Sequence, residues 1–154
     1  MASTHQEKYL DRFPGFQGDP RRPLNEEFAR LASFKQWRIG SKVYKREHTK
    51  FLRAELDLHL GVIEQCRKLE DWQVLCQELR VSPIPASITQ CKKALHKVHV
   101  NIIDLIDSRR QGTQVKIFAT TQKLVSYTRA TGNIFPKTKA KENVLLKVLL
   151  RRVF

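Results

Sequence analysis

Three cysteines and five histidines are the side chains of this chain whose chemistry is best suited to binding a metal ion. A zinc module holds its metal with ligands two to four residues apart, so that one turn supplies two of them. Cys66, Cys76 and Cys91 are separated by nine and fourteen residues, and none of them has such a neighbour. His96 and His99 would need further ligands from elsewhere in the chain. We therefore expect neither a metal site nor any other cofactor.

The cysteines favour a packing role instead. Cys76 and Cys91 fall on the apolar stripes of two predicted helices, beside Leu79 and Leu95, where a free cysteine acts as a small hydrophobic side chain. We predict two buried thiols on facing helices, without a disulfide and without a metal. An odd number of cysteines in apolar surroundings also favours reduced thiols and an intracellular protein, either nuclear or cytoplasmic.

The sequence contains no pattern that is typical of an enzyme. It has no Gly-x-Ser-x-Gly elbow, no glycine-rich phosphate loop and no His-Glu-x-x-His pair. Asp104 and Asp107 are spaced as a carboxylate pair, but such a pair is also common at the solvated edge of a helix. The six glycines leave few places for a nucleotide site lined by backbone. We expect a protein without catalytic activity.

Positive charge is concentrated in the second half of the chain. Residues 81–154 hold 14 of the 29 basic side chains and 3 of the 15 acidic ones, which is +11 of the net charge of +14. This asymmetry favours a polyanionic partner, although a solvated basic surface is a common alternative. Nucleic acid is the first candidate, with DNA favoured over RNA, because clustered cations release its condensed counterions. An acidic protein or an anionic membrane surface would use the same charges.

Residues 69–97 form the segment most typical of nucleic-acid binding. They resemble a helix-turn-helix unit, in which an apolar helix and a turn precede a second helix with Ile88 and Cys91 facing inward. The exposed start of the second helix would reach base edges and phosphates. The turn is longer than usual and contains two prolines in place of a glycine. The predicted contacts, mostly to phosphates, are Thr89, Gln90, Lys92, Lys93, Lys97, Lys116, Lys123, Arg129, Lys139, Lys147, Arg151 and Arg152.

A protein-interaction or scaffold module is the second hypothesis. In that case the basic face meets an acidic protein partner, and an aromatic N-terminal arm anchors it. The arm spans residues 1–23, whose prolines and glycines prevent a long regular element. Tyr9, Phe13 and Phe16 give it apolar side chains that either pack on the domain or dock on the partner. Neither hypothesis determines the oligomeric state.

The elements that must position these residues are predicted to be helices, in one mostly helical domain over residues 24–154. The all-α fold class follows from apolar residues that recur at helical spacing and from the capping residues between them. Val115–Phe118 is either a short β-strand or a turn, and it has a possible strand partner in Ile134–Phe135. The longest apolar runs are too short to span a membrane, and no signal peptide is expected. The five to six predicted helices cover about 26–39, 42–60, 69–81, 88–111 and 121–131, with a last one from about 138.

The last predicted helix has apolar residues on one face and cations on another. Val144, Leu145, Val148 and Leu149 share an apolar face that we expect to join the core. Its cations repeat on another face, in solvent.

Capping residues also mark the starts of earlier helices: Asn25, Ser41, Ser87 with Gln90 as a capping box, and Thr120 or Thr121.

Several segments resemble small proteins of filamentous fungi that have no assigned activity. They are residues 69–76, 87–93 and 100–105, with Tyr127-Thr128 and Ile134-Phe135-Pro136-Lys137 in the tail. The resemblance covers most of the chain after Phe28. It implies a eukaryotic intracellular setting and assigns no functional residue.

Overall fold

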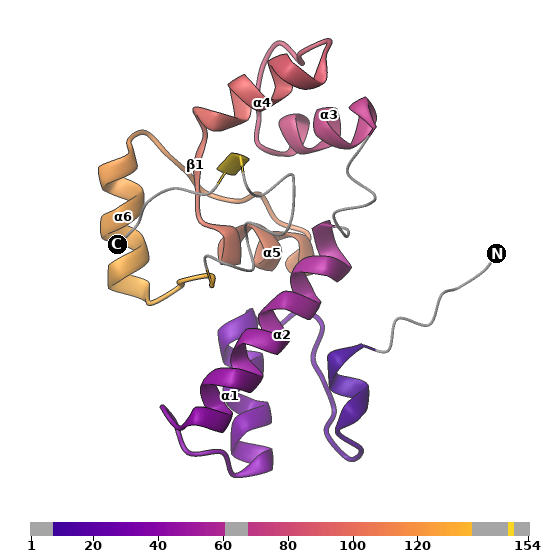
Figure 1. Cartoon of the computed structure of the whole chain (residues 1–154), viewed down its shortest axis with the longest axis vertical. Helices are drawn as coiled ribbons and strands as arrows, with labels where there is room; N and C mark the ends of the chain where they lie inside the picture. The colour runs from indigo at the N-terminus through magenta and orange to yellow at the C-terminus, as the bar shows by residue number, and fades with distance from the viewer. Residues whose placement is uncertain (1–7, 61–67, 137–147, 150–154) are drawn as a thin grey trace, which may run out of the picture.

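The computed structural model describes residues 8–60, 68–136 and 148–149 (Figure 1). These residues form six α-helices and one two-stranded antiparallel sheet, so the predicted all-α class is confirmed. The predicted helix from residue 138 lies outside the described residues, except for helical Val148–Leu149. In chain order the elements are the 3-10 turn η1 (Tyr9–Arg12), α1 (Leu24–Lys35), α2 (Lys42–Leu60), α3 (Leu69–Glu78), α4 (Ile88–His96), β1 (His99–Val100), α5 (Ile102–Gln111), β2 (Ile117–Phe118) and α6 (Thr121–Thr131).

Helix α2 connects the two ends of the molecule. One end is built from η1, α1 and the first turns of α2, and the other from α3 and α4 (Figure 1). Helix α5 packs against α1 and α2 between these ends, and α6 lies at the side against β1 and β2. This arrangement leaves α4 at the outer edge of the molecule, where α3 is the element it chiefly contacts.

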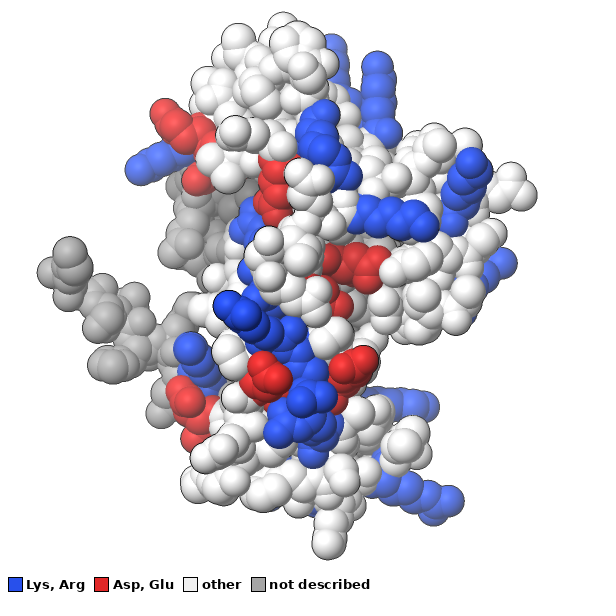
Figure 2. Space-filling model, turned by 180° about the vertical axis from the view of Figure 1, so that it is seen from behind, with Lys and Arg blue, Asp and Glu red and all other residues white. Residues whose placement is uncertain are grey.

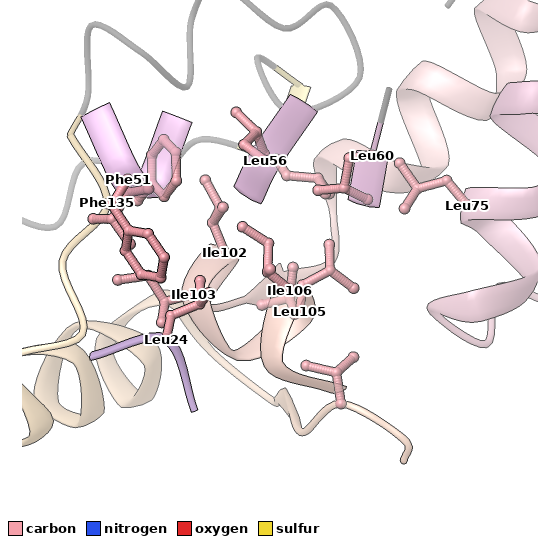
Figure 3. Packing of buried hydrophobic residues seen from close by; sticks show 14 of the residues in the cluster. Leu24, Phe51, Leu56, Leu60, Leu75, Ile102, Ile103, Leu105, Ile106 and Phe135 are labelled. Carbon is pink, nitrogen blue, oxygen red and sulfur yellow. The ribbon is translucent and has the colours of Figure 1, made fainter. Parts of the chain in front are cut away.

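The core lies around α5. Ile103, Leu105 and Ile106 are buried in one hydrophobic cluster with Phe51 and Leu56 of α2 (Figure 3). Leu149 is buried in the same cluster, as expected from the apolar face of the last predicted helix. Burial of a Leu or Ile side chain contributes about 1.5–3 kcal/mol, so this cluster supplies much of the free energy that holds the helices together.

Residues of the N-terminal arm take part in this core. Tyr9 and Phe13 are buried, with ring centroids 5.3 Å apart. The Tyr9 ring lies 5.7 Å from Phe51 of α2, and the Phe13 ring meets Trp37 edge-on at 5.7 Å. Aromatic pairs at these distances add to the burial of their surface. The described part of the arm therefore packs on α1 and α2.

Three predicted N-caps are confirmed. The hydroxyls of Ser41, Ser87 and Thr120 each accept a hydrogen bond of 3.2 Å from the backbone N–H three residues later. The prediction for Asn25 is wrong, because α1 begins at Leu24, directly after Pro23. Proline suits the start of a helix since it has no N–H to leave unpaired.

The predicted continuous helix over residues 88–111 is also wrong. The chain leaves the helical conformation after His96, forms β1, and starts α5 at Ile102. Asn101 caps α5, because its Oδ1 accepts a hydrogen bond of 3.1 Å from the N–H of Asp104. The β-branched side chain of Val100 fits an extended strand better than a helix.

Of the two alternatives for Val115–Phe118, a strand or a turn, the strand is present at Ile117–Phe118, but the prediction of its partner is wrong. β2 pairs with β1, so that His99 lies opposite Phe118 and Val100 lies opposite Ile117. Residues 134–135 do not belong to the sheet; Phe135 is buried in the core and Ile134 is exposed. Strand β1 lies within the range predicted to be helical, so the sequence pattern does not indicate its pairing with β2.

Candidate nucleic-acid interface

One side of α4 is buried and the opposite side is positively charged. Cys91 and Leu95 are fully buried against the core. At 100° per residue, Lys93 lies on the opposite side of the helix, and it is exposed. The nine residues of α4 include no acidic side chain. The residues exposed on α4 and at its end are Thr89, Gln90, Lys92, Lys93, His96 and Lys97.

Helix α3 holds α4 in place. The side-chain amide of Gln73 donates a hydrogen bond of 2.9 Å to the carbonyl oxygen of Pro85, which ties the segment before α4 to the middle of α3. The ammonium group of Lys92 lies 5.2 Å from the ring centroid of Trp72, a cation–π contact. Lys92 is thus turned toward α3, whereas Lys93 and Lys97 point into solvent.

The predicted pair of buried thiols is confirmed between these helices. Cys76 and Cys91 are free, and both side chains are fully buried. Burial, followed by hydrogen bonding to the Cys91 thiol, raises the pKa of Cys76 to about 12. Cys76 therefore stays protonated and unreactive at neutral pH. Cys66 lies outside the described residues.

The connection between α3 and α4 departs from a helix-turn-helix unit. Residues 79–87 join the helices, whereas the usual turn has about three to four residues. The N–H of Val81 bonds the carbonyl of Cys76 at 2.9 Å and so closes the end of α3. Helices α3 and α4 do pack directly on one another, but the loop between them is longer than the turn of a helix-turn-helix unit.

A second group of exposed cations lies just before β2 and on α6. Lys116, Lys123 and Arg129 are all exposed. The Lys116 ammonium lies 5.0 Å from the ring centroid of Phe118 and 5.7 Å from that of Tyr127. This group is connected to the end of α4, because β1 follows α4 in the chain and pairs with β2. The predicted contacts Lys139, Lys147, Arg151 and Arg152 lie outside the described residues.

Among the described residues, these cations have no acidic partner. Within the described residues, no ion pair involves Lys93, Lys97, Lys123 or Arg129. The basic residues that do form ion pairs there lie between Arg12 and His59 or are Arg109 and Arg110. Figure 2 shows blue side chains that project from the top and right-hand edge with no red beside them. In the middle of the lower half, blue and red lie together, while further blue side chains project from its right-hand edge without red beside them.

The two carboxylates of α5, Asp104 and Asp107, accept hydrogen bonds from other parts of the fold. Asp107 accepts a hydrogen bond of 2.8 Å from the N–H of Leu24, and Asp104 accepts one of 3.1 Å from the side-chain amide of Asn133. Burial and the neighbouring Asp104 charge raise the pKa of Asp107. A hydrogen bond to Asp104, together with burial, raises the pKa of Tyr127 to about 12. Both carboxylates thus join α5 to other elements, and neither forms the solvated edge that the sequence also allowed.

Arg109 and Arg110, in the last turn of α5, hold the fold together. The Arg110 guanidinium bonds Glu55 at 2.7 Å and the carbonyls of Asp19 and Arg22 at 2.9 and 3.0 Å. The Arg109 guanidinium donates hydrogen bonds to both carboxylate oxygens of Glu78. These two arginines are therefore not available to a polyanion, and nothing in the sequence pattern distinguishes them from the exposed cations.

A cavity of about 410 Å³ lies between the arm and helices α2 and α5. Its lining includes Asp19, Glu55, His59 and the two arginines. Burial acts to raise the pKa of Glu55, but His59 and Arg110 outweigh burial and lower it. The carboxylate of Glu55 is therefore ionised and paired with the Arg110 guanidinium. Among the described residues, no three His, Cys, Asp or Glu side chains are grouped as metal ligands.

Comparison with protein-family models, with curated proteins and with solved structures finds no match. In the described part of the chain, no helix combines the length and the apolar character needed to cross a bilayer.

Proposed function

We propose that this protein is a non-catalytic helical domain that binds nucleic acid, mainly through its phosphates. The observation that carries the proposal is the outward face of α4, where Lys93 and Lys97 are exposed and have no ion-pair partner among the described residues. Three further cations would add phosphate contacts: Lys116, directly before β2, and Lys123 and Arg129 on α6. Residues 69–97 would act as a helix-turn-helix-like unit with an extended loop.

Counterion release is the physical reason for preferring nucleic acid. A duplex carries a condensed layer of cations, and each phosphate that a lysine neutralises returns cations to solution. Cations that are already paired with carboxylates gain less from such a partner. The lysines of α4 have no such pairing among the described residues, in contrast to Arg109 and Arg110.

An acidic protein partner is less well supported, because two aromatic residues of the arm that would anchor it are buried in the core. Tyr9 and Phe13 are core residues, so they are not available as aromatic anchors. An acidic protein also lacks a condensed counterion layer, and its binding would show the shallower salt dependence of ordinary screening.

The salt dependence of binding tests the proposal. We would titrate the full chain with a mixed-sequence DNA duplex at several salt concentrations and compare the Lys93→Gln/Lys97→Gln variant with wild type. The slope of log K against log salt is expected to fall by about two, because each lost phosphate contact lowers it by about 0.9. Lys42→Gln/Lys45→Gln is the matched control, since it removes two exposed lysines from the first turn of α2. Equal losses from both variants, or no binding at low salt, would contradict the proposal.

A further inference from the structure

We infer that the nucleic acid is B-form duplex DNA and that α4 lies in its major groove. The inference rests on the proposed function and specifies its partner. It depends on the shape of the cationic surface, on the absence of free aromatic rings there, and on the side chains in the first turn of α4.

Shape is the first argument. Helix α4 lies at the outer edge of the molecule and packs chiefly on α3, so its opposite side protrudes (Figure 1). A helix with its side chains is about 10–12 Å across, which matches the major groove of B-form DNA at about 12 Å. The major groove of A-form RNA is deep and narrow and does not admit a helix. A protruding cationic helix therefore fits a DNA duplex.

The aromatic rings supply the second argument. Proteins that bind single strands stack the bases on open aromatic faces. The aromatic residues within 68–136 are Trp72, Phe118, Tyr127 and Phe135. Trp72, Phe118 and Phe135 are buried. The Lys116 ammonium lies over the rings of Tyr127 and Phe118. None of these four rings offers a free platform for stacked bases, so a single strand would rely mainly on the charge of this surface.

The first turn of α4 supplies the third argument. Thr89 and Gln90 are exposed there, next to the Ser87 cap. A Gln amide can bond adenine at N6 and N7, a Thr methyl can contact the thymine methyl, and lysine can bond guanine at O6 and N7. Thr89, Gln90 and Lys93 thus carry groups that read base edges, while Lys97 lies toward the other end and suits a phosphate.

The choice of duplex is tested with the full chain and three probes of the same sequence: a DNA duplex, an RNA duplex and single-stranded DNA. At one salt concentration we expect the DNA duplex to bind at least about tenfold more tightly than either alternative. Equal affinity for all three would overturn this inference and leave the proposed function standing. Failure to bind any of them would instead overturn the proposed function.

The groove is tested with two modified duplexes. In one, every cytosine is replaced by glucosylated 5-hydroxymethylcytosine, whose sugar fills the major groove; in the other, a polyamide saturates the minor groove of A·T tracts. We expect the sugar to weaken binding by at least about tenfold and the polyamide to leave it unchanged. The reverse result would overturn the assignment of α4 to the major groove.

Base reading is tested by selecting bound duplexes from a randomised pool. Thr89→Ala/Gln90→Ala changes two exposed side chains, so we expect a folded protein with a wild-type salt slope. We expect it to enrich different sequences from the wild type. Enrichment of the same sequences by both proteins would contradict a reading role for this turn.

Discussion

The hydroxyl of Tyr9 donates a hydrogen bond of 2.6 Å to Oε2 of Glu47, and this bond joins the N-terminal turn to α2. Both residues are buried. Burial acts to raise the pKa of Glu47, but the Tyr9 hydrogen bond and the charges of Lys50 and Arg12 outweigh it, so that the pKa is lowered. Glu47 is therefore ionised at neutral pH. The described part of the arm is held by a carboxylate as well as by its aromatic rings.

Removing this hydroxyl should destabilise the protein. We expect Tyr9→Phe to lower the free energy of unfolding by about 1.5–3 kcal/mol, which is typical of a hydrogen bond to a charged group. Urea unfolding at neutral pH measures the loss. Because the pKa of Glu47 is lowered by folding, its contribution is present above its unfolded value of 4.5 and disappears as the pH falls below the folded value. The two proteins should therefore converge in acid, and a constant difference would contradict this account.

His48 should make stability depend on pH near neutrality. Its ring centroid lies 4.7 Å from that of Phe28, and burial lowers its pKa below the ordinary value of 6.5. The unfolded chain then binds a proton at a higher pH than the folded one, so the free energy of unfolding falls as the pH drops through 6.5. We expect His48→Gln to reduce the loss of stability between about pH 7 and pH 5. Parallel curves for the two proteins would show that His48 is not the titrating group.

Asn101 should be among the most sensitive polar residues. Its Oδ1 caps α5, and its Nδ2 donates to Thr128 Oγ1 at 3.1 Å and to the carbonyl of Asn133 at 2.9 Å. We expect Asn101→Ala to cost about 2–4 kcal/mol, because it removes a cap and leaves buried partners unsatisfied. Ser87→Ala is the control: it removes an exposed cap and should cost about 1 kcal/mol. Similar costs for both would refute a special role for Asn101.

The thiols of α3 and α4 should pack without taking part in binding. We expect Cys91→Ala to lower stability by about 1 kcal/mol and to leave the affinity for a DNA duplex unchanged, because Cys91 lies on the side of α4 opposite Lys93. Cys76 should be alkylated only when the chain unfolds, which mass spectrometry of labelled peptides can follow. Rapid labelling of Cys76 in the native protein would contradict its burial.

Helix boundaries were predictable wherever one residue determines them locally. Ser41, Ser87 and Thr120 cap helices as expected, since a hydroxyl before a helical pattern acts on the next three residues alone. The break at residues 97–101 was not predictable from periodicity, because apolar residues on both sides continue the same helical spacing. Asn101 was the available signal: an Asn followed by Ile102, Ile103 and Asp104 is also a good N-cap.

The sequence shows which basic residues could form the candidate interface, but it does not show which of them are exposed. Charge counting treats Lys93 and Arg110 alike, yet Lys93 is exposed and Arg110 bonds Glu55 and two backbone carbonyls. Those partners are 55 to 91 residues away in the chain, and no local pattern brings them together. The pairing of β1 with β2 is also non-local, so only the strand and not its partner could be expected.

The position of Arg110 affects the order in which the chain becomes structured during its synthesis. The carbonyls of Asp19 and Arg22 and the carboxylate of Glu55 leave the ribosome well before the guanidinium that will bond them. At about 5–20 residues per second, the 91 residues between Asp19 and Arg110 take roughly 5 to 18 s to synthesise. Until then these groups have only water in place of that partner. The N-terminal part thus acquires its final packing only after α5 has emerged.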